Sequence, residues 1–166
     1  MQIPADTSAT AYIGLGANLG DAAATVHAAA RALGGLPGTH LLALSSLYRS
    51  APVDAQGPDF INAVAQIQTT LAPLELLAAL QRLENGAGRE RPYRNAPRTL
   101  DLDILLHGDV LSQTAQLTLP HPRLHLRRFV LWPLLELAPQ LQVPGLAPLP
   151  TLLAAVAGQA VARLNP

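Results

Sequence analysis

The stretch Arg98-Thr-Leu-Asp101-Leu-Asp103-Ile-Leu-Leu106 places two carboxylates two residues apart inside an apolar run. In an extended strand, consecutive side chains point to opposite faces, so Asp101 and Asp103 should share one face. The other face should hold the apolar residues Leu100, Leu102, Ile104 and Leu106. The pattern predicts a strand over 99–106 that packs on a core with one face and presents a charged site on the other.

The acidic pair follows a loop that contains four arginines, Arg89, Arg91, Arg94 and Arg98. Either feature alone is more typical of solvated surface than of a site. Aspartate is depleted within strands, however, and no basic residue alternates with the pair in this strand. Neighbouring carboxylates repel each other unless a cation lies between them, and hard oxygen ligands beside a polyphosphate favour Mg²⁺. Together, the two features indicate a site for phosphate and a divalent metal.

Length and composition indicate one domain spanning residues 1–166. A chain of this size buries roughly 70% of the surface that its unfolded form exposes, so it needs no covalent cross-link. The absence of cysteine excludes disulfides, thiolate nucleophiles and zinc–thiolate clusters. The start of the chain lacks leader features, and no apolar run approaches the roughly 20 residues of a membrane span. We therefore expect a cytoplasmic protein with no membrane partner.

The eleven basic residues are all arginines and balance eleven acidic residues. They form two clusters, one over 89–98 and one made of Arg123, Arg127 and Arg128. A domain that binds nucleic acid is normally basic overall, so local clusters in a neutral chain favour a small anion as ligand. Without lysine, the lysine-dependent phosphate loop is excluded, and we interpret the glycine-rich segment over 14–20 as a tight strand-to-helix connection.

The order of structural signals predicts an α+β fold. Strands are expected over 11–16, 39–48, 60–69 and 99–106. One helix should follow the capping residue Asp21 and end at Gly34-Gly35. A second should begin at Pro73, end at Asn85-Gly86 and bury one face made of Leu74, Leu77, Leu80 and Leu83. This β-α-β-β-α-β order is that of a ferredoxin-like antiparallel sheet with both helices on one face.

Further strands and helices should follow this unit toward the C-terminus. Short strands are expected near Val110 and over 117–119. One helix should cover part of 128–138, bent or started at Pro133. Another should cover 152–164.

Five separated sequence blocks resemble the 6-hydroxymethyl-7,8-dihydropterin pyrophosphokinase family of folate biosynthesis. The likeness runs from Tyr12 to about Ala138. The blocks lie at 48–52 (YRSAP), 60–63 (FINA), 97–104 (PRTLDLDI), 119–122 (LPHP) and 129–134 (FVLWPL). The resemblance implies that ATP donates its terminal two phosphates to the hydroxymethyl oxygen of the pterin, leaving AMP and the pterin diphosphate.

The resemblance also implies residue roles on the nucleotide side. Asp101 and Asp103 would hold two Mg²⁺ ions, and Arg89 and Arg98 would clamp the triphosphate; these four form the expected catalytic set. Arginine offers phosphate oxygens a planar fork of donors, which adds geometry to charge. The full set expected to bind ATP is Glu84, Arg89, Arg91, Arg98, Ile104, Thr118, His121 and Arg127.

For the pterin, a flat bicycle with a hydrogen-bonding edge, the natural receptor is two aromatic faces and an amide. Phe60 and Phe129 lie where the family stacks its substrate, and Asn62 shares the face of Phe60 in its strand. The expected pterin-binding set is Ser50, Pro52, Val53, Phe60, Asn62 and Phe129. The chain departs from the family at Ala51, Phe60, Pro122 and Asn95, where proline, tyrosine, tyrosine and tryptophan are more usual.

Two other functions fit the same residues. A magnesium-dependent nucleotidyltransferase also uses a strand with an Asp-x-Asp pair, and would attach AMP to its acceptor. A regulatory ferredoxin-like module would bind ATP without chemistry. The glycines at 86 and 88 and the arginine-rich loop predict that residues 86–97 close over ATP. We expect a monomer whose partners are small molecules.

Overall fold

The computed structural model describes residues 8–52, 57–87 and 100–164. Its first part is β1 (Ala9–Ala17), α1 (Ala22–Gly34), β2 (Thr39–Leu44), β3 (Tyr48–Ser50), β4 (Phe60–Thr69), α2 (Pro73–Ala87) and β5 (Asp101–His107). These strands are antiparallel in the order β5-β1-β4-β3, and β2 also pairs with β4. The α+β class and the ferredoxin-like β-α-β-β-α-β order are confirmed, except that the strand expected over 39–48 is divided into β2 and β3.

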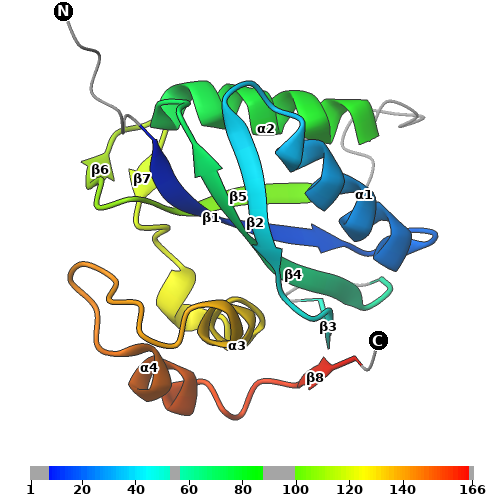
Figure 1. The fold of residues 1–166 in the computed structure, drawn as a ribbon. Coiled ribbons are helices and arrows are strands. Elements are labelled where there is room, and N and C mark those ends of the chain that lie inside the picture. The colour runs from blue at the N-terminus through cyan, green and yellow to red at the C-terminus, as the bar shows by residue number, and fades with distance from the viewer. Residues whose placement is uncertain (1–7, 53–56, 88–99, 165–166) are drawn as a thin grey trace, which may run out of the picture.

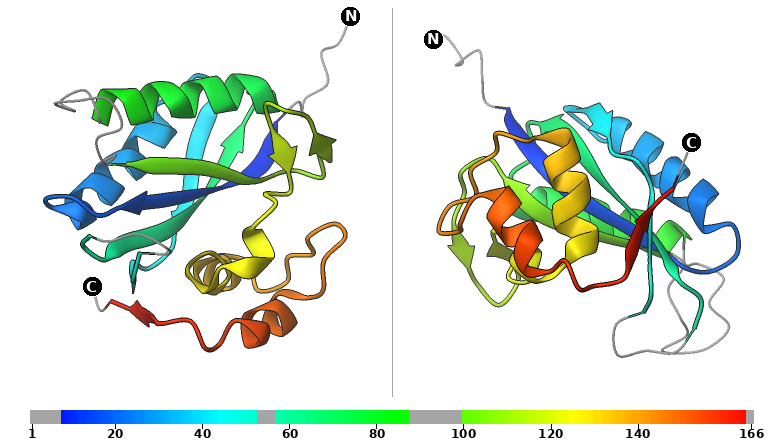
Figure 2. Two further views of the ribbon diagram at one scale, coloured as in Figure 1. Left: turned by 180° about the vertical axis from the view of Figure 1, so that it is seen from behind. Right: turned by 90° about the horizontal axis from the view of Figure 1, so that it is seen from below.

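The later part of the chain covers the other face of the sheet (Figures 1 and 2). It consists of β6 (Ser112–Gln113), β7 (Thr118–Leu119), the 3-10 helix η1 (Leu124–Leu126), α3 (Arg128–Leu137), α4 (Leu149–Ala155) and β8 (Val161–Arg163). The two short strands near 110 and 118 and the helix within 128–138 are confirmed. That helix begins at Arg128 and keeps Pro133 inside it.

The helix expected over 152–164 is wrong for its second half. The helix α4 ends at Ala155, a turn follows through Gly158, and residues Val161–Arg163 pair with β3. Glycine is a poor helix former, and the outer edge of β3 offers unpaired backbone groups to an extended segment. Pairing with β3 therefore determines the conformation of residues Val161–Arg163.

Two apolar cores hold the layers together. The first lies between the sheet and α1 and α2, and includes Ile13, Ile67, Leu76 and Leu102. The second lies on the opposite face of the sheet, where α3 and α4 pack on residues such as Val64. The alternation predicted for 60–69 is confirmed, because Ile61, Ala63, Ala65 and Ile67 all belong to the first core.

A β-bulge in β5 breaks the predicted alternation. In the pairing with β1, Ile13 lies opposite Ile104 and Tyr12 lies opposite Leu106, so Leu105 is the extra residue. Leu102 and Ile104 face the first core as expected, but Leu105 and Leu106 both belong to the second core. The prediction that Leu106 shares the face of Leu102 is wrong, because one extra residue reverses the parity of all that follow it.

The buried face of α2 is also shifted from the predicted one. Leu76, Ala79 and Leu80 are buried, whereas Leu74 is 50% exposed. Leu77 and Leu83 are partly buried at the margin of the first core. The helix continues to Ala87, so Asn85-Gly86 does not end it.

Asp21 caps α1 as its sequence position predicts. Its Oδ1 accepts a hydrogen bond from the backbone N–H of Ala24 at 3.0 Å. Replacing Asp21 with alanine should lower the free energy of unfolding by about 1 kcal/mol, because this helix donor loses its acceptor. Urea denaturation checks this value. Asp21→Asn keeps an acceptor and should stay near wild type, so an equal loss in both variants would contradict the capping role.

No helix in the described part of the chain is long and apolar enough to cross a membrane.

Candidate active site

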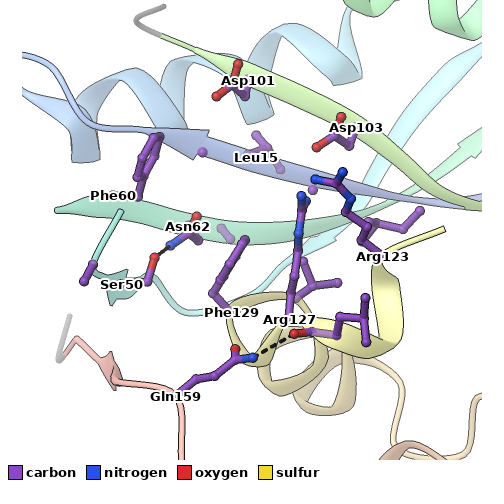
Figure 3. Close-up of a pocket in the computed structure, with 17 residues that line it drawn as sticks. Leu15, Ser50, Phe60, Asn62, Asp101, Asp103, Arg123, Arg127, Phe129 and Gln159 are labelled. Carbon is purple, nitrogen blue, oxygen red and sulfur yellow. Dashed lines mark hydrogen bonds between the residues drawn. The ribbon is translucent and has the colours of Figure 1, made fainter. Parts of the chain in front are cut away.

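A cavity of about 600 Å³, called the main cavity here, lies between the sheet and the segment that contains η1 and α3. Figure 3 shows its floor formed by β5, β1 and β4, with α3 as the opposite wall. The residues that line it include Gly14, Gly16, Ser50, Phe60, Asn62, Asp101, Asp103, Leu105, Arg123, Arg127, Phe129 and Gln159. Residues from both halves of the chain therefore meet at one place.

Asp101 and Asp103 project from β5 into the main cavity (Figure 3). Their shared face is confirmed, since the neighbouring Leu102 and Ile104 are in the first core. Asp103 is exposed, and Asp101 is half-buried. Within the described ranges, no group of three or more His, Cys, Asp or Glu side chains could hold a metal ion. A carboxylate pair still fits Mg²⁺, because that ion commonly binds one or two carboxylates and completes its shell with water and substrate phosphates.

Glycines keep the floor open between the carboxylates and β4. Gly14 lies opposite Asp103 and Gly16 opposite Asp101 in the pairing of β1 with β5. A Cβ atom at Gly16 would lie 3.3 Å from Oδ1 of Asn62, which is closer than most real Cβ contacts. Both glycines lie within β1, as the strand predicted over 11–16 requires, so the strand-to-helix interpretation concerns the later part of the glycine-rich segment. It holds for Gly20, whose φ is +60° just before α1.

Two arginines bring positive charge to the carboxylates. Arg123 and Arg127 extend from η1 and the start of α3 toward the Asp103 side of the main cavity (Figure 3). Neither forms an ion pair with a carboxylate among the described residues, so both guanidinium groups are available to an anion. The set of residues expected from the sequence to bind ATP includes Arg127 but not Arg123. Arg128, from the same cluster, instead lies 4.7 Å from the Trp132 ring centroid.

His121 lies in a second cavity, of about 650 Å³, together with Thr118. Burial lowers the pKa of its ring; the negative charge of Asp103 opposes this, and Arg127 and Arg123 lower it further. The ring is therefore neutral at pH 7. Its Nδ1 accepts a hydrogen bond from the backbone N–H of Arg123 at 3.1 Å, which leaves the proton of the neutral ring on Nε2 as a donor.

The far end of the main cavity suits a flat ligand. Phe60 and Phe129 come from opposite sides of it, one from β4 and one from α3 (Figure 3). Asn62 is 5% exposed, and its Nδ2 donates to Oγ of Ser50 at 2.7 Å and to the carbonyl of Tyr48 at 3.5 Å. Both amide donors of Asn62 are thereby directed at the protein, and its Oδ1 is left to accept from a ligand.

Other expected site residues lie away from the main cavity. The carboxylate of Glu84 accepts a hydrogen bond from the backbone N–H of Leu102 at 2.8 Å and so anchors the outer edge of β5. The Ile104 side chain is 3% exposed in the first core, which leaves only its backbone for a ligand. Pro52 is half-buried beside Ala51, which does line the cavity. Val53, Arg89, Arg91 and Arg98 lie outside the described residues, as do 88–97 of the loop expected to close and Asn95.

The main cavity thus brings together oxygen ligands for a divalent cation, guanidinium donors for an anion and an aromatic slot for a flat ring, a combination typical of phosphoryl-transfer enzymes. Residues 12–139 match the family model of 7,8-dihydro-6-hydroxymethylpterin-pyrophosphokinase (HPPK). The chain is 47% identical over 95% of its length to a 2-amino-4-hydroxy-6-hydroxymethyldihydropteridine pyrophosphokinase of Haemophilus influenzae, of which it covers 99%. A protein of the same name from Bacillus subtilis is 41% identical over 80% of both chains.

Solved structures agree on the fold. A Plasmodium falciparum HPPK-DHPS triple mutant matches 93% of this chain with a TM-score of 0.75 at 15% identity, and this chain covers 45% of it. The chain belongs to the HPPK family.

Proposed function

We propose that this chain transfers the terminal pyrophosphoryl group of ATP to the hydroxymethyl oxygen of 6-hydroxymethyl-7,8-dihydropterin, in tetrahydrofolate biosynthesis. The pterin oxygen forms a bond to the β-phosphorus, the bond from that phosphorus to the α,β-bridging oxygen breaks, AMP leaves, and the hydroxyl proton is released. The observation that supports this most is the meeting of Asp101, Asp103, Arg127 and the Phe60–Phe129 slot in one cavity. The second cavity, by contrast, has no Asp, Glu, Arg or Phe among its described lining residues.

The pterin would stack between Phe60 and Phe129. Its polar edge would meet Oδ1 of Asn62 and the region of Ser50, because the fixed amide can accept a hydrogen bond from a ring N–H. The two rings also exclude water from the hydroxymethyl group. Pro52 and Val53 complete the proposed pterin set.

ATP would extend from the second cavity to the carboxylates. Thr118 and the Nε2 proton of His121 would contact its base and ribose side, and Arg127 would contact its phosphates. We add Arg123 to this set because it lines the main cavity. Glu84, Arg89, Arg91, Arg98 and Ile104 complete the proposed nucleotide set.

Asp101 and Asp103 would hold two Mg²⁺ ions. When bound, these ions neutralise the negative charge on the phosphates and hold them in line with the acceptor. The chain itself supplies oxygen ligands from β5 and guanidinium donors from the N-cap positions of η1 and α3. Because the donors are in place before the reaction, they stabilise its developing charge without reorganisation.

The test is an assay with ATP labelled at the γ-phosphate, Mg²⁺ and the pterin. The proposal expects the label on the pterin and release of AMP. A nucleotidyltransferase would instead release labelled pyrophosphate, and a regulatory module would bind ATP without forming AMP. Either of these results would overturn the proposal.

We also propose that residues 1–166 act as one domain, as a monomer in the cytoplasm, with no nucleic-acid or membrane partner. Analytical ultracentrifugation of the full chain tests the monomer, and a dimer at micromolar concentration would contradict it.

A further inference from the structure

Gln159 joins the tail of the chain to the start of α3. It follows α4, outside the residues 12–139 that match the family model, and it lines the main cavity. Its Oε1 accepts a hydrogen bond from the backbone N–H of Arg128 at 2.8 Å, and its Nε2 donates to the carbonyl of Leu126 at 2.7 Å. Its own carbonyl accepts from Nη1 of Arg128 at 2.8 Å. Figure 3 shows the bond to Leu126 beside Arg127.

These bonds replace a cap that α3 lacks. Arg127 occupies the N-cap position, and its side chain makes no capping hydrogen bond. The first N–H groups of a helix need acceptors from outside the helix. Gln159 provides one for Arg128 from a segment 31 residues away in sequence.

The two side-chain bonds lie on either side of Arg127. The carbonyl of Leu126 belongs to the peptide group before Arg127, and the N–H of Arg128 belongs to the peptide group after it. The orientations of these two peptide groups determine φ and ψ of Arg127, which are −125° and 110°. The peptide group after Arg127 is also held by α3 itself, because its carbonyl accepts from the N–H groups of Val130 and Leu131 at 3.0 Å. Gln159 adds a bond to that group and also holds the peptide group before Arg127.

Among the described residues, the Arg127 side chain forms no ion pair and lies against an aromatic ring. Its Cζ lies 5.6 Å from the centroid of the Phe129 ring, two residues further along α3. Any rotation of the backbone at 127 would therefore move the phosphate-side guanidinium and disturb the pterin-side ring with it. We infer that Gln159 is a positioning residue that holds Arg127 and Phe129 in place for binding of ATP and pterin; this inference rests on the proposed function.

The experiment compares three variants in the full chain. Gln159→Met keeps the length of the side chain but removes both amide hydrogen bonds, and should lower kcat/KM for both substrates about fivefold, mainly through KM. Gln159→Glu keeps an acceptor for Arg128 and should recover part of this loss. Gln140→Met makes the same exchange in an exposed turn and should match wild type.

Two further measurements separate positioning from a purely structural role. In an Arg127→Ala background, Gln159→Met should add little further loss, because residues that act through one another are not additive. Hydrogen exchange at the Arg128 amide should be faster in Gln159→Met, which reports the bond without reference to activity.

Unchanged kinetic constants in Gln159→Met with a lowered melting temperature would overturn the inference, and so would full additivity with Arg127→Ala. If wild type and Gln140→Met are also inactive, the proposed function itself fails, and the inference falls with it. If wild type is active and Gln159→Met has the same kinetic constants, only the inference about Gln159 is rejected.

Discussion

Asp103→Ala is expected to lower kcat about 1,000-fold or more while the fold stays intact. The side chain lies beside the arginines at the point where the phosphates are proposed to lie, and it supplies half of the carboxylate pair. It is exposed, so its removal should change the free energy of unfolding by no more than about 0.5 kcal/mol. Steady-state kinetics with ATP and pterin, together with a urea titration, measure both quantities.

Asp109→Ala is the matched control for this prediction. It removes the same charge from the exposed turn that follows β5, outside the main cavity. Its turnover should equal that of wild type. Retained turnover in Asp103→Ala, or an equal loss in Asp109→Ala, would contradict the proposal that the Asp103 carboxylate holds Mg²⁺.

Glu136→Ala is expected to lower the free energy of unfolding by about 3 kcal/mol at pH 7, because one carboxylate serves several donors across three elements. Its Oε1 accepts from the hydroxyl of buried Tyr48 at 2.6 Å, and its Oε2 accepts from the N–H of Ser46 at 2.9 Å and from its hydroxyl at 3.2 Å. Nη2 of Arg163, in β8, lies 3.9 Å from Oε1 of Glu136. Without the carboxylate, the Tyr48 hydroxyl remains buried with no acceptor. Urea denaturation measures the loss.

The same contacts make this stabilisation dependent on pH. Desolvation alone would raise the pKa of Glu136, but the hydrogen bonds from Tyr48 and Ser46 and the charge of Arg163 together lower it. A lowered folded-state pKa means that the stabilisation is complete above the ordinary value of 4.5 and is lost as the pH falls through the folded value. The pKa of Tyr48 is raised, first by burial and then by Glu136, so its phenol stays protonated at neutral pH.

The difference in stability between wild type and Glu136→Ala should therefore be constant from pH 6 to 8 and smaller below pH 4. A difference that stays the same down to pH 3 would contradict the role of the charge. Tyr12→Phe and Tyr48→Phe form a matched pair of controls. Both tyrosines are buried, but only the hydroxyl of Tyr48 bonds to a carboxylate among the described residues. Tyr48→Phe should lose about 1.5 kcal/mol, and Tyr12→Phe no more than about 0.5 kcal/mol.

Local sequence patterns were sufficient to predict the central strands of the sheet and the acidic pair. A period of two along 60–69 places Phe60 and Asn62 on the face opposite Ile61 and Ala63, and the same period places Asp101 with Asp103. These predictions succeed because side-chain alternation depends only on the extended backbone. The order of strands and helices then limits the topology to one common arrangement.

Features that depend on distant parts of the chain could not be predicted in this way. The bulge at Leu105 arises from the pairing with β1 and reverses the face of Leu106. The role of Gly14 and Gly16 depends on the side chains across the sheet, so their spacing in the sequence does not reveal it. Gln159 carries no local signal, because its partners lie on another element. The cluster of arginines at 123–128 was a usable signal for Arg123, but spacing alone could not tell which of its members face the cavity.

The pairing of β8 with β3 also determines how the sheet ends. A long strand with free backbone groups is a template for a strand from another molecule, and proteins avoid this with short or charged outer strands. Here the outermost strand on that side has three residues and includes the partly exposed Arg163. The pairing of the chain's own tail thus occupies the backbone groups of β3 and leaves a short, charged strand as the border of the sheet on that side.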